Sequence, residues 1–270
     1  MSAILIPVLV VAVIGLIAGI GLSVASIIMA VPVDEKAMAV RDVLPGANCG
    51  ACGYSGCDGY AKALADGTAK NGLCSPGGAA CANDIAAILG VAAGEIKAKT
   101  AVVKCNGTCD KTGKTYKYDG VKSCAAINMI YSGDGKCSYG CLGLGDCIKA
   151  CPNNAISICN GVAVINASSC IACGQCVPRC PKNLIDIVFG DSPAVVFCSN
   201  KDKGGQTRKQ CSAGCIGCMR CEKTCTHDAI KVSNFVAHID SDKCIGCGDC
   251  VSVCPSNCID LLKIKQLQNA

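Results

Sequence analysis

The chain has 270 residues, of which 28 are cysteine, and its formal charge is +5. It contains no Trp, three Phe and six Tyr, a composition that argues against a single large hydrophobic core. The spacing of the cysteines argues against the disulfide framework of a secreted domain. The sequence also lacks motifs for dinucleotide binding, phosphate binding or hydrolysis.

The N-terminal segment predicts a transmembrane anchor over residues 1–33. Residues 2–33 carry no charged side chain, and the apolar run from Ile4 to Met29 is long enough to cross a bilayer. A cleaved signal peptide is the alternative, but no basic residue precedes the run, which exceeds the usual apolar region of a signal. The first basic residues, Lys36 and Arg41, follow the run and predict that the rest of the chain lies on the cytoplasmic side.

A compact cysteine motif follows the anchor and defines a predicted domain over residues 34–80. Cys49, Cys52, Cys57 and Cys74 have the spacing C-x2-C-x4-C-x16-C, with glycines that let the backbone turn tightly between them. We expect these four thiolates to hold one [4Fe-4S] cluster. A zinc site is the alternative, because four cysteines alone do not identify the metal. Residues 81–135 form a connecting region with an apolar helical stretch near 85–91.

The C-terminal half is an internal duplication with an offset of 74 residues. Two modules, residues 136–190 and 211–270, flank a linker at 191–210. Each repeats the C-x-x-C-x-x-C-x-x-x-C runs of two-cluster ferredoxins. The offset relates eight cysteines of the first module, Cys137, Cys141, Cys147, Cys151, Cys170, Cys173, Cys176 and Cys180, to Cys211, Cys215, Cys221, Cys225, Cys244, Cys247, Cys250 and Cys254 of the second. Apolar pairs after each run predict short strands that cover the clusters.

The duplication predicts the ligand sets, with one mismatch. Cys218 of the second module aligns with Leu144, so the first module needs another ligand, and Cys137 is the substitute that we expect. The predicted sets of the first module are Cys137, Cys141, Cys147 and Cys180 on one cluster and Cys151, Cys170, Cys173 and Cys176 on the other. Those of the second are Cys215, Cys218, Cys221 and Cys254, and Cys225, Cys244, Cys247 and Cys250.

Five clusters use twenty cysteines and leave eight. Cys198 and Cys211 bracket the Lys/Gly-rich part of the linker, and Cys105 and Cys124 bracket a similar Lys/Gly-rich stretch before the first module. We predict that these four, Cys105, Cys124, Cys198 and Cys211, hold a sixth cluster that bridges the modules, with Cys109 as a possible substitute. The alternative is that all eight are free thiols.

The predicted fold is therefore α+β: a single N-terminal transmembrane helix, a small four-cysteine iron-sulfur domain, and two tandem ferredoxin-like two-cluster modules. Six oxidised clusters at about −2 each would change the net charge to about −7, so the basic composition does not indicate nucleic-acid binding. Iron-sulfur clusters also place the bulk of the protein in a reducing compartment.

The residues resemble the B subunit of the Rnf complex, the ion-translocating ferredoxin:NAD oxidoreductase. The resemblance rests on one N-terminal span, the LPGANCGACG block, the CSYGCLGLGDC block and the remaining ferredoxin motifs. It implies a subunit anchored in the cytoplasmic membrane that relays electrons between soluble ferredoxin and flavin- and cluster-bearing partner subunits, with no complete active site of its own. Multi-span membrane subunits are the other implied partners.

Two other interpretations of the motifs are possible. A polyferredoxin subunit of a hydrogenase or heterodisulfide reductase assembly would carry similar ferredoxin runs, although the C-x2-C-x4-C-x16-C block after a single span favours the Rnf family. A purely structural metal scaffold would show no redox change at low potential.

Overall fold

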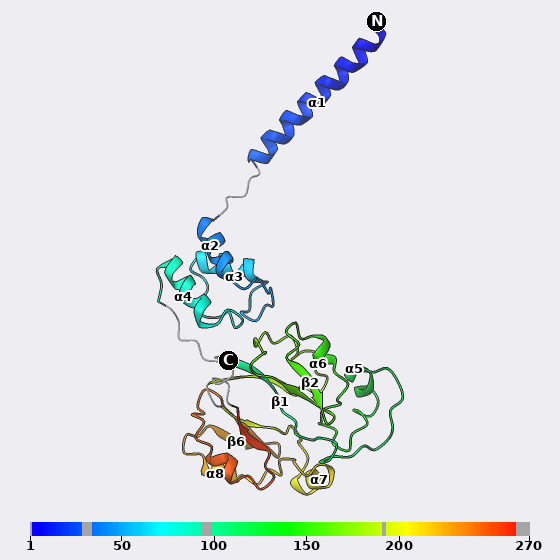
Figure 1. The fold of residues 1–270 in the computed structure, drawn as a ribbon, viewed down its shortest axis with the longest axis vertical. Helices are drawn as coiled ribbons and strands as arrows, with labels where there is room; N and C mark the ends of the chain where they lie inside the picture. The colour runs from blue at the N-terminus through cyan, green and yellow to red at the C-terminus, as the bar shows by residue number, and fades with distance from the viewer. Residues whose placement is uncertain (1, 29–33, 93–98, 191–192, 263–270) are drawn as a thin grey trace.

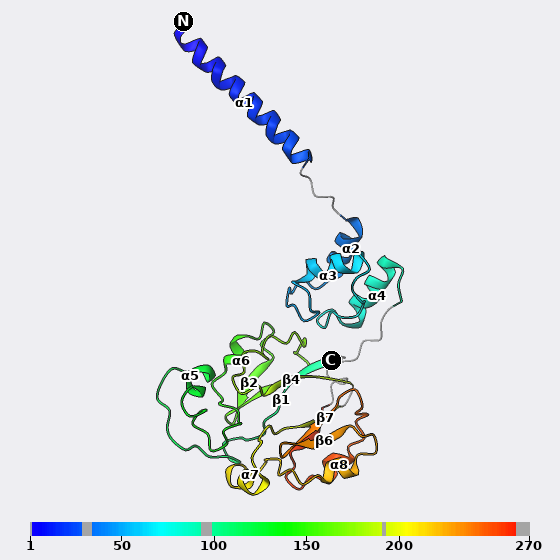
Figure 2. The ribbon, with the colours of Figure 1, turned by 180° about the vertical axis from the view of Figure 1, so that it is seen from behind.

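The computed structural model describes residues 2–28, 34–92, 99–190 and 193–262 (Figure 1). They form one long helix, a helical domain, and a body in which two similar units of short strands and helices lie side by side (Figure 2). This mixture of helices and strands agrees with the predicted α+β class.

Helix α1 (Ser2–Ile28) is one continuous helix of 27 residues, and its described apolar side chains, such as Leu16 and Leu22, are exposed. In the part of the chain that the structure describes, no helix is long and apolar enough to cross a membrane. Residues 29–33 of the predicted anchor lie outside the described residues.

The helical domain consists of α2 (Glu35–Val43), α3 (Cys57–Ala65) and α4 (Gly78–Leu89). The Asp34 carboxylate caps α2 by accepting a 2.9 Å hydrogen bond from the Lys36 amide, and Gly90 ends α4 in the left-handed conformation. Val40, Tyr60 and Ile85, one from each helix, are almost fully buried in a shared core. This core continues past residue 80, the predicted end of the domain, because α4 closes it.

Each module contains an antiparallel hairpin, β2 (Ile156–Cys159) with β3 (Val162–Ile165) and β6 (Ile230–Ser233) with β7 (Val236–Ile239). The two-residue turn between β2 and β3, Asn160-Gly161, has positive φ at both positions, as a tight hairpin turn requires. The hairpins confirm the strands predicted after the first cysteine run of each module.

The second strand pair of each module recruits a segment from outside the predicted module. Strand β1 (Lys99–Val103) pairs with β4 (Ile185–Phe189), and β5 (Ala194–Val196) pairs with β8 (Ile259–Leu261). The predicted connecting region and linker therefore contribute β1 and β5 to the modules. The remaining helices are short: α5 (Cys124–Asn128), α6 (Asp146–Lys149), α7 (Gly204–Gln210), α8 (Arg220–Thr224) and α9 (Asp249–Ser252).

The module cores are small and rich in cysteine. In the first module Leu184 and Ile185 pack with Val103, Val162 and several thiols, and the second module repeats this arrangement with Val196, Val236 and Ile259. With so few large side chains, the apolar residues form a thin shell around the cysteines.

Candidate metal centres

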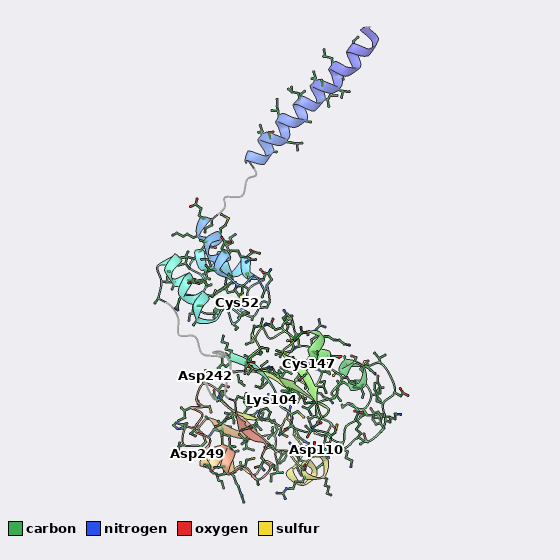
Figure 3. The ribbon with its side chains drawn as sticks, viewed as in Figure 1. Cys52, Lys104, Asp110, Cys147, Asp242 and Asp249 are labelled. Carbon is green, nitrogen blue, oxygen red and sulfur yellow. The ribbon has the colours of Figure 1, made fainter. Side chains whose placement is uncertain are left out.

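Twenty-four of the 28 cysteines lie in six groups of four, one in the helical domain, two in each module and one between the modules, and Cys81, Cys109, Cys159 and Cys258 lie outside these groups. Figure 3 shows how the side chains are distributed through the helical domain and the two-unit body, with Cys52 and Cys147 labelled.

The N-terminal site is formed by Cys49, Cys52, Cys57 and Cys74, whose thiols are close enough to interact electrostatically. The Asn48 side-chain oxygen accepts a 2.8 Å hydrogen bond from the Cys57 amide and so fixes the start of α3 beside the cysteine loop. Tyr60 holds the segment before Cys74 in place, because its hydroxyl accepts a hydrogen bond from the Leu73 amide and donates one to the Lys70 carbonyl. The four predicted residues therefore lie together.

The outer site of the first module is formed by Cys151, Cys170, Cys173 and Cys176, again the predicted set. Burial raises the pKa of the Cys176 thiol to about 11, and the neighbouring thiols contribute to this rise. Cys173 also interacts electrostatically with Cys49 of the N-terminal site.

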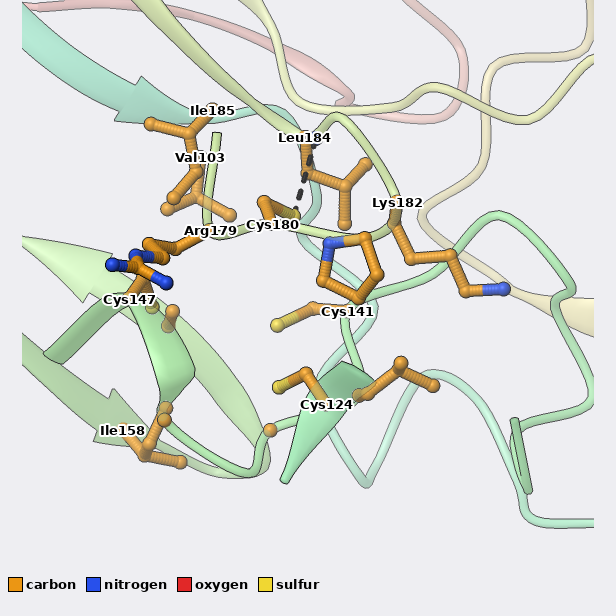
Figure 4. Close-up of a pocket in the computed structure, with 15 residues that line it drawn as sticks. Val103, Cys124, Cys141, Cys147, Ile158, Arg179, Cys180, Lys182, Leu184 and Ile185 are labelled. Atoms are coloured by element: carbon orange, nitrogen blue, oxygen red, sulfur yellow. Dashed lines mark hydrogen bonds between the residues drawn. The ribbon is translucent and has the colours of Figure 1, made fainter. Parts of the chain in front are cut away.

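The inner site of the first module differs from the prediction. Cys124, Cys141, Cys147 and Cys180 line one apolar pocket with Val103, Leu184 and Ile185, and in Figure 4 the sulfur atoms of Cys124, Cys141 and Cys180 point into it. Cys137, which the sequence placed in this set, does not line this pocket. The physical reason is α5: the Asp146 carboxylate accepts hydrogen bonds from the Ser123 hydroxyl (2.8 Å) and the Ala125 amide (3.0 Å), which hold Cys124 beside Cys147.

The bridge site lies between the modules and contains Cys137 in place of the predicted Cys124. Cys105, Cys137, Cys198 and Cys211 line a common pocket, at whose edge lies Cys141 of the neighbouring inner site. The Asn200 side-chain amide donates a 3.4 Å hydrogen bond to the Cys137 sulfur, and an isolated bridge between Thr112 and Cys211 joins the two long loops. Cys109 is exposed, and its amide bonds instead to the Asn160 carbonyl.

The duplication of the modules explains why these four cysteines form the bridge site. Cys137 and Cys211 are duplicates at the 74-residue offset, and Cys105 and Cys198 each stand two residues beyond strands β1 and β5, which are equivalent in the two modules. Each module thus contributes one such pair.

The second module keeps its predicted sets. Cys215, Cys218, Cys221 and Cys254 form its inner site. Cys225, Cys244, Cys247 and Cys250 line a pocket that is its outer site.

A further thiol, Cys258, lies at the inner site of the second module and was not predicted from the sequence. Its sulfur is 3.6 Å from that of Cys254, and a hydrogen bond from Cys258 lowers the pKa of Cys254 to about 5. Its alignment with Leu184, which directly follows the C-P-x-x segment of the first module, was the signal that could have identified it.

The donor chemistry fits four-iron clusters. Each group offers four sulfur donors in a mostly apolar wall, and backbone amides point at the sulfurs, as from Leu184 to Cys180 (3.4 Å). Burial raises the pKa of Cys147 to about 12 and that of Cys198 to about 11. At neutral pH these thiols would therefore become thiolates only when a metal binds and displaces their protons. Among the described residues, no three His, Cys, Asp or Glu side chains are arranged around a single metal ion.

Comparison with known families supports this chemistry. Residues 44–76 match the family described as "Putative Fe-S cluster", residues 163–186 the "4Fe-4S binding domain", and residues 210–261 the "4Fe-4S dicluster domain".

Three curated relatives are similar to this chain over most of their length. The B subunit of the Na(+)-translocating ferredoxin:NAD(+) oxidoreductase complex of Acetobacterium woodii is 43% identical over 96% of this chain and 78% of the relative. The B subunit of the proton-translocating ferredoxin:NAD(+) oxidoreductase complex of Clostridium ljungdahlii is 40% identical over 90% and 87%. The B subunit of the ion-translocating oxidoreductase complex of Methanosarcina acetivorans is 39% identical over 97% and 100%.

Proposed function

The chain belongs to the family of B subunits of ion-translocating oxidoreductase (Rnf) complexes, and we propose that it is the iron-sulfur subunit that relays electrons within such a complex. A [4Fe-4S] cluster, when bound, accepts and donates one electron at low potential. The chain offers the cysteines that hold such groups. Its catalytic contribution is therefore to position redox centres for the ferredoxin:NAD+ oxidoreductase activity of the complex.

The observation that carries the proposal is that neighbouring sites interact at three junctions: between the N-terminal site and the first module, and on each side of the bridge site. Cys49 of the N-terminal site interacts electrostatically with Cys173 of the outer site of the first module. The Cys141 amide, from the inner site of that module, donates a 3.4 Å hydrogen bond to the Cys105 sulfur of the bridge site. On the other side of the bridge, the Cys198 sulfur accepts from the Cys215 amide of the second module.

Together with the paired clusters of the two-cluster ferredoxin arrangement within each module, these interactions support an ordered relay of six clusters. The order is the N-terminal site, the outer and inner sites of the first module, the bridge site, and the inner and outer sites of the second module. Without ligands at the bridge site, the two modules would be separate two-cluster units. Whether electrons can pass from one module to the other therefore depends on the four bridge cysteines, Cys105, Cys137, Cys198 and Cys211.

The membrane anchor is part of the proposal. The N-terminal 33 residues contain an uncharged run, residues 2–33, and the 27-residue helix α1 leads away from the helical domain with exposed apolar side chains (Figure 1). We place α1 in the cytoplasmic membrane, with residues 34–270 on the cytoplasmic side. There the chain would meet soluble ferredoxin and the flavin-bearing and multi-span subunits of the complex.

Iron analysis combined with redox titration tests this function. Anaerobically purified full-length protein should contain about 24 irons and 24 sulfides per chain, and its low-temperature electron paramagnetic resonance signals should appear on reduction by reduced ferredoxin. Zinc in place of iron, or clusters that ferredoxin does not reduce, would contradict the proposed function.

A further inference from the structure

Cys258 is a buried thiol outside the six groups of four cysteines. It is 2% exposed and follows Cys254 by four residues, directly before β8. Its sulfur lies 3.6 Å from that of Cys254, a member of the inner site of the second module, and its side chain packs in the same core as Cys215 and Cys221 of that site. A buried polar group usually has a hydrogen-bond partner, and here the partner is a predicted cluster ligand, Cys254.

The duplication supplies an internal comparison. At the equivalent position the first module has Leu184, which is 1% exposed and lines the pocket of its inner site. The backbone is held in the same way in both modules, because the Leu184 carbonyl accepts a 2.7 Å hydrogen bond from the Lys104 amide and the Cys258 carbonyl a 2.7 Å bond from the Phe197 amide. At this position, therefore, the two inner sites differ in whether the side chain can donate.

We propose that Cys258 is a positioning residue whose S–H group donates a hydrogen bond to the thiolate of Cys254 and so makes the inner cluster of the second module easier to reduce than that of the first. This inference rests on the proposed function. Reduction adds one electron to a cluster that is already negative, so a donor aimed at its thiolates stabilises the reduced form more than the oxidised form. The S–H bond stays intact, and no proton or bond is exchanged.

The expected effect is modest, because a thiol is a weak donor. We expect removal of the donor to lower the equilibrium constant for reduction of this cluster about threefold to tenfold. A tenfold change in a one-electron couple is about 59 mV. Within the relay, this difference would favour electron flow from the first module toward the second.

The test is an anaerobic redox titration of the holo-protein, followed by electron paramagnetic resonance, with iron measured on the same samples. Cys258→Leu copies the first module and should shift one titration step to lower potential, with the iron content unchanged. Leu184→Cys is the reciprocal change and should raise the potential of the inner cluster of the first module. Cys258→Ser retains a donor and should keep the wild-type value, and the exposed Cys159→Ala is the control.

Each outcome is decisive. Unchanged potentials in both Cys258→Leu and Leu184→Cys would overturn the inference, and so would a loss of about four irons in Cys258→Leu, because Cys258 would then be a ligand. If Cys258→Leu does not fold, Leu184→Cys decides the question alone, because an unchanged potential of the inner cluster of the first module would overturn the inference. Failure of the proposed function would be distinguishable, because the wild-type protein itself would then lack reducible clusters.

Discussion

Removal of Cys124 or Cys137 tests the assignment in which the structure departs most from the sequence. The structure places Cys124 with Cys141, Cys147 and Cys180, and Cys137 with Cys105, Cys198 and Cys211. A Cys→Ala change at either position should abolish one cluster, because a neutral methyl group cannot replace a thiolate ligand. The single variants therefore cannot distinguish the two assignments, but pairs of changes can.

The expected iron content of each double variant depends on whether its two cysteines hold the same cluster or two different clusters. From about 24 irons, each single variant should fall to about 20. Cys124→Ala with Cys147→Ala should stay at about 20, because both changes remove the same cluster, whereas Cys137→Ala with Cys147→Ala should fall to about 16. Cys137→Ala with Cys198→Ala should again stay at about 20.

Iron and acid-labile sulfide are measured on anaerobically purified protein, with circular dichroism as the check that each variant is folded. The reverse pattern, about 16 irons for the Cys124/Cys147 pair and about 20 for the Cys137/Cys147 pair, would refute the placement of α5. It would restore the set expected from the sequence.

Three further predictions follow from the same structure. Anaerobic removal of iron should abolish the near-ultraviolet circular dichroism and the cooperative melting of the two modules, because cysteines make up much of their cores; retention of both would contradict this. A fragment of residues 34–90, which includes the α4 core residue Ile85, should bind about four irons, whereas one zinc with no visible absorbance would contradict the iron assignment. Asp146→Ala should speed loss of iron to a chelator at pH 7 about thirtyfold, since the variant loses two hydrogen bonds that contribute about 1 kcal/mol each, with the exposed Asp228→Ala as control. Burial opposes ionisation of Asp146, but hydrogen bonds from Ala125 and Ser123 hold its pKa below the ordinary value. The ionised Asp146 therefore stabilises the start of α5 above about pH 4, and this stabilisation is lost as the pH falls through the pKa of Asp146 in the folded protein.

The sequence predicted the features that depend on local spacing. The N-terminal group from Cys49 to Cys74, the outer sets of both modules and the strands after each cysteine run are all encoded within short segments, where chain geometry leaves few alternatives. The hairpins β2–β3 and β6–β7 were predictable for the same reason.

Features that depend on contacts between distant segments were not predictable in this way. Strand β1 pairs with β4 although it comes from a segment with no cysteine motif. Cys124 lies in the first module because the Asp146 carboxylate accepts a hydrogen bond from the Ala125 amide in the first turn of α5. The sequence did contain one unused clue: Cys137 and Cys211 are duplicates, so assigning Cys211 to the bridge should have placed Cys137 there as well.

The central claim, that the bridge site joins the modules into one relay, is tested most directly in the intact complex. Ferredoxin-dependent NAD+ reduction is measured in membranes that carry either Cys198→Ala or the control Cys159→Ala, together with the iron content of each purified variant. The relay predicts that Cys198→Ala loses about four irons and reduces NAD+ at the background rate, whereas the control keeps wild-type values. A Cys198→Ala complex that lacks those irons and still reduces NAD+ at the wild-type rate would contradict it.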